Sequence, residues 1–156
     1  MKPFQFRGER ILEWRRAMAG TARGEFLRAA ESVREALHLA HEADARAALA
    51  SREAVDALRE AVDVGTIERH RIWIGQEQRH ADRARLAHQD RQRAADEKAA
   101  VLQLATRHVK VMERLRERAR QRYRDLERHL ELKALNELAT MQFTRRRAEE
   151  GVERDH

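Results

Sequence analysis

The sequence contains no cysteine, which excludes a disulfide framework, a thiolate metal site and a cysteine nucleophile. Aromatic residues make up only 4% of the chain, and Pro3 is the single proline. Such a shortage of aromatics argues against a compact globule, whereas the abundance of alanine, arginine, glutamate and leucine favours long helices or a coiled coil. Because these residues are strong helix formers, we interpret the 38% of charged residues as helix surface rather than disorder.

Long apolar runs are also missing. The longest uninterrupted runs hold about four residues, as at positions 99–102, whereas a membrane-spanning helix needs about 20. The opening residues, MKPFQFRGER, lack the apolar region of a signal peptide. We therefore predict a cytoplasmic protein with no direct membrane insertion.

A seven-residue apolar repeat runs through the first half of the chain. Two sets of positions, three residues apart, are apolar with the single exception of Arg15. An a/d repeat sustained over about 53 residues predicts a left-handed coiled coil. Because most of these positions are alanine, the partner helix must approach closely and buries little area per residue. The two sets are Leu12, Ala19, Phe26, Val33, Ala40, Ala47, Ala54 and Ala61, and Arg15, Ala22, Ala29, Ala36, Ala43, Ala50, Ala57 and Val64.

A second repeat follows a break that contains Gly65 and Gly75. Glycine weakens a helix by about 1 kcal/mol relative to alanine, so we place a turn or short connector there. The fold class is therefore all-α, a long antiparallel two-helix coiled coil forming one domain over 1–156. We expect helix 1 over about 5–64, a connector over about 65–77 and helix 2 over about 78–148. The second seam comprises Ala81, Ala84, His88, Ala95, Leu102, Ala105, Val109, Met112, Ala119, Tyr123, Leu126 and Leu130, interrupted by Arg91, Lys98 and Arg116.

Arginine alternates with other residues near the middle of the second helix. Charged flanks of a coiled coil are usually solvated, and nearby glutamates pair with part of this set. An excess of positive charge remains, which suits phosphates or an acidic protein surface. Because Tyr123 is the only aromatic residue there, stacking on bases has little support and nucleic acid is disfavoured. This basic belt comprises Arg114, Arg116, Arg118, Arg120, Arg122 and Arg124.

No pattern of catalysis or of metal and cofactor binding is present. His41-Glu42 is not followed by the second histidine of a zinc protease motif, and no glycine-rich phosphate loop occurs. A two-helix rod also lacks an enclosed cavity for a catalytic centre. We therefore expect no catalytic residues, no cofactor, no metal and no enzymatic activity.

The end of the second helix has more apolar residues than one seam needs. Leu130, Ala134, Leu138 and Met141 continue the seam, while a second stripe lies on roughly the opposite face. The beginning of helix 1 also has apolar residues away from its seam, and in a hairpin both termini lie at one end. Either Phe4 and Phe6 fold back to form a local third layer, or this end binds a partner, which we favour. The surplus residues are Leu132, Leu135, Ala139 and Phe143 on helix 2, and Ile11, Trp14 and Met18 on helix 1.

Both ends of the chain resemble those of FliJ-type proteins of flagellar type III export. The N-terminal Phe4-Gln5-Phe6, followed by Ile11-Leu12 and Arg15-Arg16, is similar to the family's opening. The segment RLRERARQRYRDLERHLELKALNELA, at 114–139, is similar to its end. Asn136 stands where the family usually has aspartate, and Gly8 where leucine is common.

The resemblance implies a non-enzymatic coiled coil similar to the central stalk of rotary ATPases. Its partners would be the export ATPase hexamer, the export-gate membrane protein and substrate-specific export chaperones, at the cytoplasmic side of the flagellar basal body. A basic arm that binds nucleic acid and a structural dimer forming a four-helix bundle remain alternatives. By this resemblance the ring-facing end includes Phe4, Phe6, Ile11, Leu12, Leu135, Glu137, Leu138 and Ala139, to which the apolar surplus adds Trp14, Met18, Leu132 and Phe143.

Overall fold

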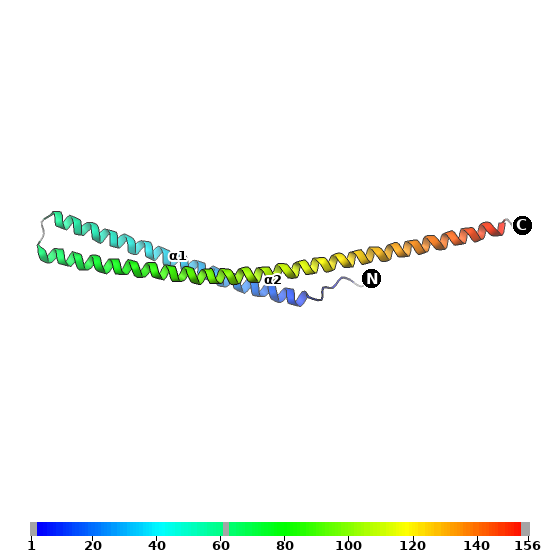
Figure 1. Cartoon of the computed structure of the whole chain (residues 1–156), viewed down its shortest axis with the longest axis horizontal. Helices are drawn as coiled ribbons and strands as arrows, with labels where there is room; N and C mark the ends of the chain where they lie inside the picture. Colours follow the sequence, from blue (N-terminus) through cyan, green and yellow to red (C-terminus); the bar gives the residue numbers. More distant parts are fainter. Residues whose placement is uncertain (1–2, 61–62, 154–156) are drawn as a thin grey trace. The chain divides into compact units, whose positions relative to one another are not determined.

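The computed structural model describes residues 3–60 and 63–153, with side chains as far as 147, and its regular structure there is helical (Figure 1). Helix α1 spans Glu9–Arg59 and helix α2 spans Val64–Glu153. The predicted all-α helical hairpin is confirmed. Helix α1 is shorter at both ends than the sequence indicated, and helix α2 begins well before the predicted position.

The chain divides into two units. Residues 15–107 form one, and residues up to Trp14 form the other together with those from His108 onward. Each unit thus contains parts of both helices. The single domain expected over 1–156 stays a prediction.

Within residues 15–107 the helices run antiparallel, side by side (Figure 1). Lys98 Nζ donates a hydrogen bond to Glu25 Oε2 at 2.7 Å, and Arg85 contacts Asp44 at 2.6 Å. Later residues of α1 therefore meet earlier residues of α2. The hydrogen bond from Lys98 holds the pKa of the Glu25 carboxyl below its ordinary value, and the one to Asp44 raises the pKa of Arg85.

The predicted α1 seam is the buried face of that helix. Every a and d position from Leu12 to Ala57 is buried or half-buried, Arg15 included. Ala50 has no exposed surface, and Ala43 is 2% exposed, as expected where small side chains let two helices approach closely. Ala61 lies outside the described residues. Val64 does not belong to this seam, because it is the first residue of α2 and is exposed.

The α2 seam is buried or half-buried from Ala81 to Tyr123 at every apolar position predicted, and half-buried at His88. The cations that interrupt it have a structural role. Lys98 pairs with Glu25, and Arg116 Nε lies 3.3 Å from a Glu9 carboxylate oxygen. Two of the three interruptions are therefore ion pairs between the helices.

The predicted connector over 65–77 is wrong, because these residues form the first turns of α2. Helix α1 ends at Arg59 and α2 begins at Val64, directly after Asp63, whose side chain caps α2. Asp63 Oδ1 accepts a hydrogen bond from the Thr66 backbone N–H at 3.0 Å, and Oδ2 accepts one from the Thr66 hydroxyl at 2.8 Å. These bonds lower the pKa of the Asp63 carboxyl. A glycine penalty of about 1 kcal/mol is too small to break a helix held by packing, so Gly65 and Gly75 stay helical.

Candidate functional site

The N-terminal segment packs against α2 inside its own unit. The Phe4 and Tyr123 rings lie 5.6 Å apart between centroids, with their planes at 58°. Leu12 has no exposed surface, and Phe4 and Phe6 are half-buried. Phe4, Phe6 and Leu12, which were predicted to bind a partner, therefore contribute to internal packing. This folding back of the two phenylalanines matches part of the local-layer alternative.

Gly8 allows this close packing. A Cβ atom there would lie 2.8 Å from the Phe6 ring and 3.0 Å from the Met112 methyl, which is closer than side chains normally approach. A larger side chain at position 8 would require the Phe6 ring or the Met112 side chain to move.

The remaining predicted residues of α1 face outward. Ile11 and Trp14 are more than half exposed, and Met18, in the other unit, is slightly less so. Their exposure is compatible with a binding role. The structure does not bring Ile11 or Trp14 to the apolar end of α2, however.

The end of α2 from Leu126 to residue 147 is a single helix without a covering helix in the described chain. All its large apolar side chains are exposed, with Leu135 at 61% and Phe143 at 64%. Figure 1 shows this part of α2 continuing past the N-terminal segment of the same unit. We call residues 126–147 the tail. The predicted partner-binding residues in it are Leu132, Leu135, Glu137, Leu138, Ala139 and Phe143, all exposed.

The expectation that one tail stripe closes the hairpin is wrong. Leu130, Leu138 and Met141 are all exposed, as are the large side chains of the second stripe. The reason is the position of the N-terminal segment, since Phe4 contacts Tyr123. At 1.5 Å per residue, Leu132 lies about 13 Å farther along α2 and Phe143 about 30 Å. Both stripes are therefore open.

The basic belt lies on the part of α2 against which the N-terminal segment packs, and it is followed directly by the tail. All six of its arginines are exposed. Among the described residues, only Arg116 of this set forms an ion pair, with Glu9 at 3.3 Å. Most of the positive charge of the belt is therefore not neutralised by ion pairs. Tyr123 rests against Phe4, so the only aromatic ring of the belt is already in contact.

The described residues contain no group of three or more histidine, aspartate or glutamate side chains placed to hold a metal ion. No helix in the described ranges is both long enough and apolar enough to cross a membrane. The surfaces that remain as candidates are the tail, the basic belt and a groove between the two helices.

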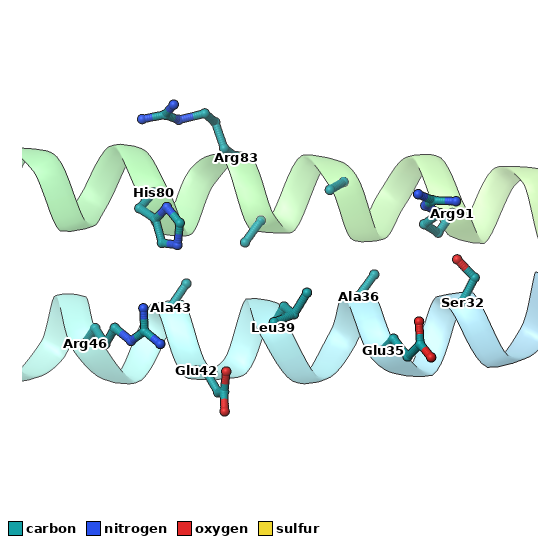
Figure 2. Close-up of a pocket in the computed structure, with 12 residues that line it drawn as sticks. Ser32, Glu35, Ala36, Leu39, Glu42, Ala43, Arg46, His80, Arg83 and Arg91 are labelled. Carbon is teal, nitrogen blue, oxygen red and sulfur yellow. The ribbon is translucent and has the colours of Figure 1, made fainter.

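Sequence patterns did not reveal that groove, which lies between residues 32–46 of α1 and 80–91 of α2 (Figure 2). Its volume is about 510 Å³, and alanines from both helices form its floor. The available signal was the row of positions beside the seam, where Leu39 and Ala87 are exposed. The a and d pattern does not include this row, because its residues lie beside the seam and not in it.

No protein-family model matches the chain, and it has no significant match among the curated proteins or the solved structures.

Proposed function

We propose that this chain is a non-enzymatic stalk and adaptor of a flagellar-type protein export apparatus. Its tail binds the ring of the export ATPase, and other surfaces contact the export gate and substrate chaperones at the cytoplasmic side of the basal body. The observation that carries the proposal is the tail, a helix whose two apolar stripes both lack a covering helix among the described residues.

The two stripes constrain the kind of partner. At 100° per residue their centres lie about 150° apart around the helix. One helix packed alongside could cover only one stripe, because a helical contact buries an arc of about 100°. A partner that surrounds the tail covers both. The opening of a protein ring has this geometry, and a ring-shaped partner is what the FliJ-type resemblance implies.

The charge next to the tail supports the same kind of partner. The belt arginines Arg114, Arg118, Arg120, Arg122 and Arg124 form no ion pair with the described residues. Unpaired guanidinium groups favour carboxylate or phosphate partners, which they bind through paired N–H donors. An acidic rim on a protein ring would neutralise them.

The belt also suits a second candidate, a nucleic-acid arm. Tyr123 packs on Phe4, and the belt has no other aromatic ring for base stacking, so binding by the belt would depend on phosphates. It would weaken steeply with salt, with a slope near −0.9 per duplex phosphate contacted. Absence of RNA or DNA binding at about 100 mM salt would eliminate this candidate.

The test of the stalk proposal is binding of the full chain to purified export ATPase hexamer. Leu135→Asp combined with Leu138→Asp places a charge on each stripe of an exposed helix. If each leucine contributes about 1.5–3 kcal/mol of burial, the dissociation constant should rise at least about 100-fold. Circular dichroism should show unchanged helicity, since neither side chain packs inside the chain.

The matched control is Leu27→Asp with Leu49→Asp, two exposed leucines of α1 in the other unit. This control should bind the ring like the wild-type chain. Equal ring binding by the tail variant and the wild type would refute the assignment of the tail.

A further inference from the structure

The groove between α1 and α2 has a different charge on each rim. Figure 2 shows Glu35 and Glu42 on the α1 side, and Arg83 and Arg91 on the α2 side. Among the described residues, Glu35 and Arg91 form no ion pair, and Glu42 has only a 3.8 Å contact with His38. Asp90, beside Arg91 but outside the groove, is paired with Arg93 at 3.8 Å. The α1 rim also includes Arg46, so its two glutamates leave it with one net negative charge, whereas the α2 rim has His80 and two arginines and is basic.

The charges on the two rims are in register. In Figure 2, Glu42 lies across the groove from Arg83, and Glu35 lies across from Arg91. Between the charges lies an apolar floor of alanines from which Leu39, 61% exposed, projects. Leu39 stands midway between the two glutamates of α1.

A similar arrangement occurs on the other helix, where the two arginines are eight residues apart and the two glutamates of α1 are seven apart. Ala87 stands midway between Arg83 and Arg91, as Leu39 does between the two glutamates. A large side chain on one rim thus corresponds to a small one on the other. Such large-to-small complementarity is how helices interdigitate in a packed interface.

We propose that this groove is a self-association surface and that its occupant is the same groove of a second copy of the chain. A twofold axis along the groove exchanges the two rims, as in an isologous interface. Glu42 and Glu35 of each copy then face Arg83 and Arg91 of its partner. The same operation places each Leu39 on the partner's Ala87.

The charge pattern also selects the direction of the axis. A twofold axis across the groove would place acidic rim on acidic rim and basic rim on basic rim, which like charges disfavour. Only the axis along the groove brings opposite charges together, at the Glu42–Arg83 and Glu35–Arg91 levels, while Arg46 faces the partner's His80. The product is a four-helix arrangement around the alanine floors of residues 32–46 and 80–91. The proposed role of the tail is independent of this contact, which involves residues 15–107 alone.

The first test is the mass of the full chain in solution by sedimentation or light scattering. The wild type should form a dimer of twice 18.3 kDa. Glu42→Arg should raise the dimer dissociation constant at least about tenfold, because it places an arginine opposite Arg83 in both symmetry-related contacts. Adding Arg83→Glu to Glu42→Arg should restore the dimer, since the exchange keeps the rims complementary.

The matched control is Glu31→Arg, which reverses a charge on α1 outside the groove and should leave the dimer intact. Circular dichroism checks that each variant stays helical. A monomeric wild type, or a double exchange that fails to restore the dimer, would overturn the proposal. The proposal would also be overturned if Leu135→Asp with Leu138→Asp abolished the dimer while Glu42→Arg and Leu39→Asp each left it intact.

A second test uses the absence of cysteine in the chain. Glu42→Cys and Arg83→Cys are made as separate single variants and then mixed under oxidising conditions. The mixture should give a disulfide-linked dimer, whereas a mixture of Glu35→Cys with Arg83→Cys should not, because these positions are two turns out of register. Equal cross-linking in both mixtures would contradict the proposed register.

Discussion

In residues 15–107 the most deeply buried side chains are alanines, whereas in residues 126–147 the leucines, Met141 and Phe143 are all exposed. Small residues are buried because two helices with alanine seams can approach closely along their length. Large residues are exposed because the described chain offers no helix to cover them. In this protein, burial depends on what lies opposite a residue more than on how hydrophobic the residue is.

The difference has an energetic side. An alanine seam buries little apolar area, so the hairpin gains little stability at each position at about 25 cal/mol per Å². Ion pairs between the helices supplement it, although exposed pairs such as Glu25 with Lys98 contribute little. The tail has large apolar side chains with no helix packed on them in the described chain.

The largest expected effect on the free energy of unfolding comes from replacing leucine by alanine at a buried position, compared with the same replacement at an exposed one. Leu12→Ala removes a side chain with no exposed surface and should lower the free energy of unfolding by about 2–5 kcal/mol. Leu135→Ala removes the same atoms from an exposed position and should change it by less than about 0.5 kcal/mol. Urea denaturation followed by circular dichroism measures both. Equal losses would mean that a covering helix protects Leu135 in solution.

A second pair of variants replaces alanine by the larger leucine. Ala50→Leu inserts a large side chain where the helices approach closely, and overpacking should cost about 1–3 kcal/mol. Ala139→Leu, on the exposed tail, should leave the free energy of unfolding unchanged within about 0.5 kcal/mol. Thermal melts of both variants provide the measurement. A stabilising Ala50→Leu would show that the seam is looser than its burial indicates.

The smallest expected effect concerns the turn that creates the paired region. Asp63→Ala removes the cap of α2 and should lower the melting temperature by about 2–4 °C at neutral pH. The pKa of Asp63 is lower in the folded chain, so its contribution is complete above the ordinary aspartate pKa and is lost as the pH falls through the folded value. Wild type and variant should therefore melt alike near about pH 2.

The control for the cap is Asp125→Ala, in the interior of α2, where Asp125 accepts a hydrogen bond only from Gln121 at 2.9 Å. Alanine is a better helix former than aspartate, so this change should not lower the melting temperature. If both substitutions destabilise equally, Asp63 has no special role as a cap.

Much of the fold was predictable from the sequence because the seven-residue repeat is nearly unbroken. Every described seam position from Leu12 to Ala57 is buried or half-buried, and the second seam holds from Ala81 to Tyr123. The predicted turn followed the two glycines Gly65 and Gly75, whereas the Asp63–Thr66 cap marks the start of α2. The groove was not foreseen, because it depends on residues of α1 and α2 that become neighbours only when the helices pair.

The sequence shows a surplus of apolar residues after Leu130. It does not show which of the two apolar stripes another helix covers. The prediction that one tail stripe closes the hairpin failed, since the N-terminal segment packs at Tyr123 and leaves the tail uncovered. Periodicity shows which faces of a helix are apolar and carries no information on the length of the helix opposite.

The sequence by itself determined that the chain is helical, that its seam repeats every seven residues and that the end of α2 has two apolar stripes. These are local properties, because side-chain spacing and helix propensity act within a few turns. Only the tertiary structure decided where the chain reverses, which cations form ion pairs and which stripes stay exposed. Those outcomes depend on the register between α1 and α2, which is fixed by contacts between residues far apart in the sequence.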